Sequence, residues 1–266
     1  MATPDILARI ISHKKQEIKD DRQELSLNEI KALANNLPKG RGFVKALQQK
    51  TAQNQPAVIA EVKKASPSKG VLRQDFNPVA IAVDYQQAGA SCISVLTDNR
   101  FFHGKNKYLQ QVVEATTIPI LRKDFIIEPY QVYQAKVIGA DCILLIAAVL
   151  DFEQMQQLTS IAQSLNMDVL VEVHNQAELT KSLQLDLPMI GINNRNLHDF
   201  STDLNTTIGL LNQIPEEIIV VTESGILQRP DVEFMLANGV NSFLVGEAFI
   251  KEPSPGKALQ NLFFKN

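Results

Sequence analysis

The chain has 266 residues, of which 45% are hydrophobic and 21% are charged, and its net charge is −3 at pH 7. This composition is typical of a soluble globular protein, and the slight acidic excess argues against a nucleic-acid surface. No window holds the roughly 18 apolar residues of a membrane span, and no basic segment precedes an apolar stretch near the start. We therefore expect a cytoplasmic protein without a membrane partner.

The first 56 residues predict a helical extension. Apolar side chains in the segment 6–20 recur as they would on one face of a helix, and helical patterns continue at 27–35 and 42–50. We expect the segment 1–56 to pack on a larger domain at 57–266, and nothing in it suggests a catalytic residue.

From residue 57 onward, short apolar runs alternate with longer amphipathic segments. The runs are rich in β-branched residues and predict eight strands, at 57–62, 92–97, 118–122, 141–146, 168–173, 189–193, 218–222 and 242–245. Helical patterns lie between them at 78–88, 106–115, 129–138, 151–164, 201–212 and 229–238. This α/β alternation favours a single (β/α)8 TIM barrel, with a doubly wound parallel sheet as the alternative.

The cysteines and histidines argue against several classes of site. Cys92 and Cys142 fall inside apolar runs, where we expect buried, reduced thiols. The four histidines are far apart, and neither a His-x-His nor a Cys-x-x-Cys pattern occurs, so we expect no metal site. Dinucleotide, nucleotide-hydrolysis and serine-hydrolase motifs do not occur either.

The end of the first predicted strand carries two opposite charges. Side chains alternate between the faces of a strand, so Glu61 and Lys63 share one face and the apolar residues between them share the other. A strand that is buried on both faces excludes charges unless they are paired or bind something. The pair therefore marks a candidate active site.

Polar residues also stand at the ends of other predicted strands. In a TIM barrel the active site lies at the carboxyl ends of the strands. Taken singly, each of these residues could belong to a structural ion pair or a turn, but together they predict one pocket. They are Lys123, Glu172, Asn193, Arg195, Glu223, Ser224 and Glu247. The same strand ends also carry Phe125, Leu197, Gly225, Leu244 and Gly246.

A phosphate site is expected beside the last two strands. Gly225 and Gly246 follow the seventh and eighth strands, where barrels commonly bind phosphate through backbone N–H groups. Ser66, with Lys64 or Lys69, would close the other side of this site.

The run of motifs resembles the indole-3-glycerol phosphate synthase family. The resemblance extends from the N-terminal helices to the last strand, and its most specific element is Glu-x-Lys-x-x-Ser-Pro. It rests on the segments 59–70, 94–98 with Phe102 and Gly104, 121–126, 171–174, 191–197, 222–226 and 243–247. The resemblance implies a carboxy-lyase of tryptophan biosynthesis that uses no cofactor. Its substrate would be 1-(2-carboxyphenylamino)-1-deoxyribulose 5-phosphate, a phosphorylated small molecule.

Acid–base chemistry suits this reaction, because ring closure requires an acid to protonate the ribulose carbonyl. Lys123 is our choice for that acid. We expect crowding of the two lysines to lower the pKa of one of them, with Glu61 opposing the shift. Lys63 would hold the anthranilate carboxylate or protonate the departing hydroxide.

The resemblance favours Glu172 as the later base, supported by Glu61. The sequence does not decide which lysine and which glutamate act in each step.

The remaining roles follow from the resemblance. Asn193 and Glu223 would bind the ribulose hydroxyls and Arg195 the carboxylate. Phosphate binding would involve Ser66, Ser224, Gly225, Gly246 and the backbone of Glu247, and the aromatic pocket would be lined by Phe102, Phe125, Leu197 and Leu244. We expect a monomer or a weak homodimer. Two alternatives are a Schiff-base aldolase that uses Lys123 or Lys63, and a non-catalytic sugar-phosphate sensor.

Overall fold

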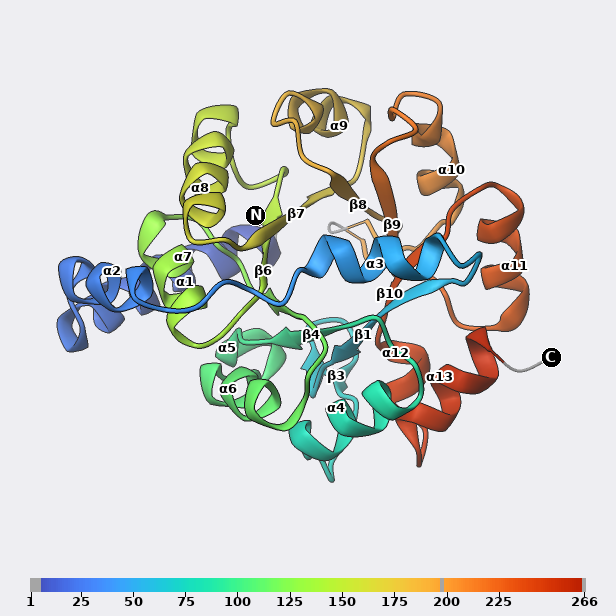
Figure 1. Cartoon of the computed structure of the whole chain (residues 1–266), viewed down its shortest axis with the longest axis horizontal. Coiled ribbons are helices and arrows are strands. Elements are labelled where there is room, and N and C mark those ends of the chain that lie inside the picture. The colour runs from blue at the N-terminus through green and yellow to red at the C-terminus, as the bar shows by residue number, and fades with distance from the viewer. Residues whose placement is uncertain (1–5, 197–198, 265–266) are drawn as a thin grey trace.

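The computed structural model describes residues 6–196 and 199–264. Its parallel strands close into a barrel in the order β1-β10-β9-β8-β7-β6-β5-β4, with β4 paired to β1 (Figure 1). The strands are β1 (Ala57–Val62), β4 (Cys92–Leu96), β5 (Ile120–Lys123), β6 (Cys142–Ile146), β7 (Asp168–Val173), β8 (Met189–Asn193), β9 (Ile219–Glu223) and β10 (Ser242–Val245). The predicted TIM barrel is confirmed, and its closure excludes a doubly wound sheet.

Helices cover the outside of the barrel, and a short hairpin, β2 (Ala65–Ser66) with β3 (Gly70–Val71), follows β1. The helices are α4 (Pro78–Gln87), α5 (Asn99–Phe102), α6 (Asn106–Ala115), α7 (Pro129–Val137), α8 (Phe152–Ser164), α9 (Gln176–Leu183), α10 (Asn205–Leu211), α11 (Arg229–Ala237), α12 (Glu247–Ile250) and α13 (Pro255–Phe263). The helix expected from residue 201 begins only at Asn205, because Thr202 forms a β-bridge with Arg195. Within the described ranges, no helix is long and apolar enough to cross a membrane.

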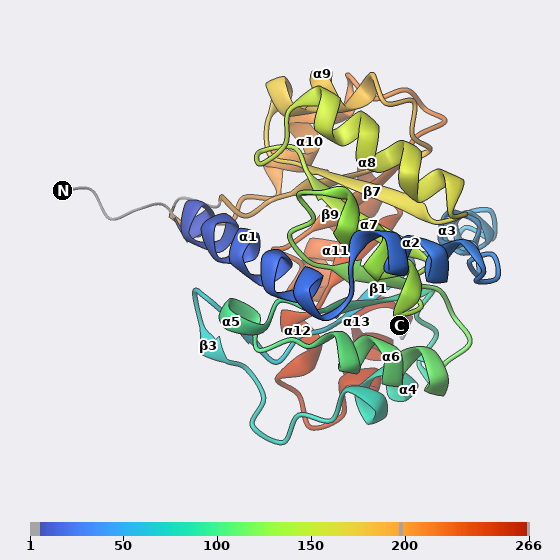
Figure 2. The ribbon, with the colours of Figure 1, turned by 90° about the vertical axis from the view of Figure 1, so that its left-hand side faces the viewer.

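Three helices precede the barrel: α1 (Ile6–Glu24), α2 (Leu27–Asn35) and α3 (Phe43–Thr51). Phe43 and Leu47 of α3 are fully buried and pack on the barrel interior beside Cys92, whose thiol is free, as expected. Figure 2 shows α3 at one end of the barrel and α1 at the other, near α5 and β3. We propose that residues 1–56 form an extension that covers both ends of the barrel domain at 57–266.

Lys14 ties α1 to the carboxyl ends of the strands. It stands between Ile10 and Ile18 on the buried face of α1 and is 0% exposed. Its Nζ lies 2.9 Å from Asp124 Oδ1 and 3.2 Å from Asp98 Oδ2, and both carboxylates are buried. Burial alone would lower the pKa of Lys14, but these carboxylates raise it above its ordinary value. Lys14 therefore stays charged and connects the extension to β4 and β5.

We expect Lys14→Met to destabilise the fold strongly. The substitution leaves Asp98 and Asp124 buried with less compensating charge, and breaking a buried pair in this way costs about 3–5 kcal/mol. The free energy of unfolding, measured by urea titration with circular dichroism, should fall by that amount. Lys15→Met, on the exposed side of the same helix, should change it by less than about 0.5 kcal/mol. Equal unfolding midpoints for the two variants would contradict the anchoring role.

Candidate active site

One cavity at the carboxyl ends of the strands brings the predicted site residues together. Leu197 lies outside the described residues. Neither Lys64 nor Lys69, the two alternatives offered beside Ser66, lines the cavity. The remaining predicted residues all line it, namely Glu61, Lys63, Ser66, Phe102, Lys123, Phe125, Glu172, Asn193, Arg195, Glu223, Ser224, Gly225, Leu244, Gly246 and Glu247. Strand ends that are far apart in the sequence therefore meet at one mouth of the barrel, as the fold requires.

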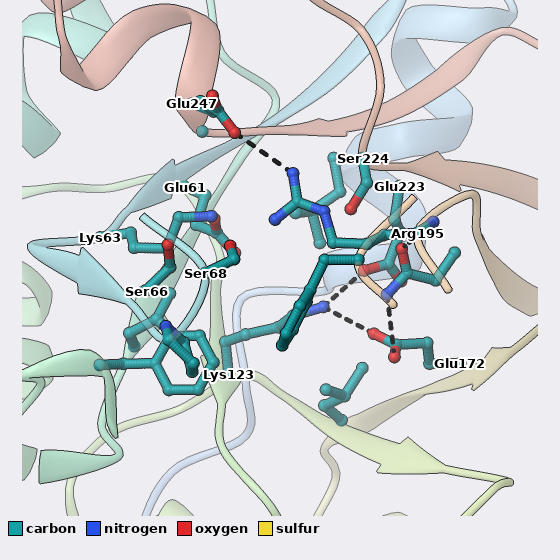
Figure 3. Close-up of a pocket in the computed structure, with 18 of the residues that line it drawn as sticks. Glu61, Lys63, Ser66, Ser68, Lys123, Glu172, Arg195, Glu223, Ser224 and Glu247 are labelled. Carbon is teal, nitrogen blue, oxygen red and sulfur yellow. Dashed lines mark hydrogen bonds and ion pairs between the residues drawn. The ribbon is translucent and has the colours of Figure 1, made fainter. Parts of the chain in front are cut away.

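Lys123 lies at the centre of this cavity, between two carboxylates. Its Nζ donates a hydrogen bond of 3.0 Å to Glu172 Oε2 and another to Glu223 Oε2 (Figure 3). Asn193 Nδ2 donates to the second oxygen of Glu172, Oε1, at 3.2 Å. The ends of β5, β7, β8 and β9 thus share one polar network, in which the Lys123 side chain is almost fully buried.

The charges of this network shift the pKa values of its members. Burial would lower the pKa of Lys123, but Glu172 and Glu223 raise it above its ordinary value. The expectation of a lysine with a lowered pKa is therefore wrong for Lys123, because its paired carboxylates outweigh both burial and any repulsion from Lys63.

The two carboxylates differ from each other. Burial would raise the pKa of Glu172, but Lys123 and His174 lower it to about 2. Burial and the nearby Glu172 raise the pKa of Glu223 to about 7, against the effect of Lys123. Glu223 Oε1 is buried and finds no hydrogen-bond partner within the described part of the chain. Glu172 is therefore held ionised, whereas Glu223 keeps one buried oxygen, Oε1, packed close to Gly191.

Glu61 and Lys63 form an ion pair on the opposite side of the cavity from Glu172 (Figure 3). Glu61 is only 4% exposed, so its carboxylate lies buried against this one cationic partner. Gly246 makes room for it, since a Cβ at this glycine would lie 2.6 Å from Glu61 Oε1. Gly246, which was expected at a phosphate site, thus also leaves the space that the Glu61 side chain occupies.

The expected phosphate side contains a tight turn and a cluster of cations. Ser224 and Gly225 both have positive φ, 63° and 84°, directly after β9. The carboxylate of Glu247 accepts hydrogen bonds from Lys69, from Lys251 Nζ at 2.8 Å and from Arg195 Nη2 at 3.2 Å. Partial burial would raise the pKa of Glu247, but these contacts, led by the two lysines, lower it to about 2. Glu247 is therefore the ion-pair partner of Arg195 on this side of the cavity.

An apolar wall completes the cavity. The rings of Phe102 and Phe125 lie with their centroids 6.0 Å apart. Ile6, Leu7 and Ile10 of α1 also line the cavity, a contribution that the sequence did not reveal. Their spacing is that of any helix packed on a core, so the pattern carried no signal that they face a ligand pocket.

The comparisons with known proteins agree on the family. The family model of indole-3-glycerol phosphate synthase matches residues 7–262. Proteins named indole-3-glycerol phosphate synthase in two strains of Acidithiobacillus ferrooxidans are 54% identical to the chain over 260 residues, covering 98% of it and 99% of each relative.

Solved structures with low sequence identity share the fold. The 3-hexulose-6-phosphate synthase of Salmonella typhimurium has a TM-score of 0.63 at 12% identity, covering 77% of this chain and 96% of its own. Tryptophan synthase subunit alpha of Legionella pneumophila has a TM-score of 0.62 at 14% identity, covering 85% and 97%. The fold likeness and the family match converge: the chain belongs to the indole-3-glycerol phosphate synthase family, lyases of tryptophan biosynthesis.

Proposed function

We propose that the cavity converts 1-(2-carboxyphenylamino)-1-deoxyribulose 5-phosphate to indole-3-glycerol phosphate, carbon dioxide and water, without a cofactor, and that Lys123 is the general acid of ring closure. The observation that carries this assignment is the position of Lys123 in the cavity, where its ammonium group is held between Glu172 and Glu223. The family membership of the chain supports the overall reaction.

Ring closure begins when the aromatic carbon that bears the carboxylate attacks the ribulose carbonyl. The carbonyl oxygen gains negative charge as the bond forms, and a lysine ammonium can protonate it. With both carboxylates paired to it, the raised pKa of Lys123 makes it a weak acid. Substrate hydroxyls that donate to Glu172 and Glu223 would withdraw negative charge from Lys123 and lower its pKa when the acid is needed.

The later steps require a base and a second acid. After decarboxylation the hydroxyl leaves with a proton, and the carbon next to the nitrogen loses a proton as the indole becomes aromatic. Glu172 is our candidate for this base, because its low pKa keeps it ionised. Glu61 would support it through Lys63, which would hold the substrate carboxylate or protonate the leaving hydroxyl.

The remaining residues would bind the substrate. Asn193 and Glu223 would contact the ribulose hydroxyls, and Arg195 would contact the anthranilate carboxylate. The phosphate would lie against the backbone of Ser224, Gly225, Gly246 and Glu247, with Ser66 opposite. Phe102, Phe125 and Leu244 would enclose the aromatic ring, as their positions on the cavity wall permit.

Two further properties belong to this proposal. We propose that the enzyme acts in the cytoplasm, where its buried Cys92 and Cys142 thiols would stay reduced. We also propose a monomer or a weak homodimer, and one chain is sufficient to line the cavity with the described site residues.

Lys123→Ala should reduce kcat by about 10²-fold or more, because it removes the general acid. Turnover of the carboxyphenylamino-ribulose phosphate can be followed by the fluorescence of the indole product. Lys107→Ala, which changes an exposed lysine on α6, is the matched control and should leave kcat unchanged. Near-full activity of Lys123→Ala would refute the assignment.

Glu172→Gln should slow aromatisation by about 10²-fold, because it removes the base. In a single turnover, carbon dioxide should then appear before the indole fluorescence. Glu61→Gln should give a shorter lag, because Glu61 only supports this step. If Glu61→Gln gave the longer lag, the roles of the two glutamates would be reversed.

Borohydride separates this mechanism from a Schiff-base aldolase. Acid catalysis forms no imine, so reduction of the enzyme–substrate mixture should leave Lys123 and Lys63 unmodified in a peptide mass map. A reduced substrate adduct on either lysine would favour the aldolase mechanism instead.

A further inference from the structure

His174 is a partly buried ionisable residue that the mechanism above does not use. It directly follows β7, and its backbone N–H and its ring Nδ1 lie 2.8 Å and 3.1 Å from Glu178 Oε2 on α9. Its other ring nitrogen, Nε2, lies 3.4 Å from Glu172 Oε1. This Nε2 is buried and has no hydrogen-bond partner among the residues described. The imidazole thus bridges the proposed base and a second carboxylate.

A second cavity lies on the other side of this imidazole. His174 and Glu178 line it together with Asn175, Asn194, Asn196, Ser201, Asp203 and Thr206. His174 does not line the substrate cavity, but Asn193 and Arg195 line both cavities. A series of three side chains therefore leads from the substrate cavity to a separate polar space. Lys123 Nζ lies 3.0 Å from Glu172 Oε2, and Glu172 Oε1 lies 3.4 Å from His174 Nε2.

The proton balance of the reaction shows that these three side chains need a supply of protons. One proton goes to the carbonyl oxygen at ring closure, and a second leaves with the hydroxyl as water. One proton returns to the base from the carbon next to the nitrogen. Because the substrate carboxylate leaves as neutral carbon dioxide, each turnover consumes one proton in net terms. When Lys63 holds the substrate carboxylate and Lys123 protonates both the carbonyl oxygen and the leaving hydroxyl, Glu172 returns one of these protons to Lys123, and the other must come from solvent.

We propose that His174 is a positioning and proton-relay residue that keeps Glu172 ionised and delivers the solvent proton to the Lys123–Glu172 pair from the second cavity. The proposal rests on the acid and base roles assigned above to Lys123 and Glu172. In the relay, Nε2–H of the imidazolium gives its proton to Glu172, and Glu172 passes a proton to the Lys123 amine. The imidazole then regains a proton from water in the second cavity.

The charges around His174 favour its protonated form. Glu172 on β7, Glu178 on α9 and Glu223 on β9 face it, while Arg195 and Asp203 share its cavity. Burial would lower the pKa of His174, but the hydrogen bond to Glu178 and the charges of the three glutamates raise it. A group with a raised pKa loses its proton as pH rises through that pKa. The relay should therefore stop delivering protons when the pH exceeds the pKa of His174.

The experiment compares kcat as a function of pH in the wild type and in His174→Gln. The wild-type kcat should fall as pH rises through the pKa of His174. In His174→Gln, kcat should be about tenfold lower, a smaller loss than for a direct acid or base, and this alkaline fall should be absent. Thr206→Ala removes a non-ionisable side chain from the same cavity and should keep the wild-type profile. KM should change little in both variants.

A second variant separates a relay from a purely structural role. Imidazole added to His174→Ala should restore kcat in proportion to the imidazolium concentration, whereas a structural defect would not respond in this way. The proposal requires both results, so an unchanged alkaline limb in His174→Gln, or no rescue of folded His174→Ala, overturns it. Glu172→Gln is measured in parallel. If it keeps full activity, the base assignment fails, and if the wild type makes no indole product, the proposed function fails.

Discussion

The site depends on one buried ammonium group held between two carboxylates. Lys123, Glu172 and Glu223 come from β5, β7 and β9, and their charges can be buried only because they compensate each other. Closure of the barrel supplies this compensation, since it brings strand ends 49 and 100 residues apart within hydrogen-bond distance. The same arrangement holds Glu172 ionised, and Glu223 Oε1 has no hydrogen-bond partner among the residues that the structure describes.

A second buried lysine supports this arrangement from outside the barrel. Lys14 binds Asp124, the residue directly after Lys123, and Asp98, which caps α5 ahead of Phe102. Helix α1 therefore contributes apolar wall to the cavity and also contacts the segments that carry the proposed acid and an aromatic side chain. The extension is part of the site, although none of its residues has a role in proton transfer in our proposal.

Much of the fold was accessible from the sequence because the strands are strongly patterned. The β-branched runs located every barrel strand to within about two residues, and alternation put Glu61 and Lys63 on one common face, from which both line the cavity. Alternation gives the face of a side chain but not its partners. The sequence predicted a lowered lysine pKa, and for Lys123 this prediction was wrong. The pKa of Lys123 depends on carboxylates contributed by other strands.

Other features had weaker signals. Lys14 was detectable in principle, as a charge at the i+4 position between Ile10 and Ile18 on an apolar helix face. His174 belonged to a recognised motif, but its position between Glu172 and Glu178 follows from how β7 and α9 pack.

In the free enzyme Glu172 and Glu223 hold Lys123 protonated. Nitrogen NMR of the lysine Nζ groups, with Lys123 assigned by comparison with Lys123→Arg, tests this most directly. Exposed lysines lose their protons around their ordinary pKa of about 10.4. Lys123 should remain protonated above that pH, and Glu172→Gln should lower its midpoint. A Lys123 midpoint at or below that of the exposed lysines would contradict the account.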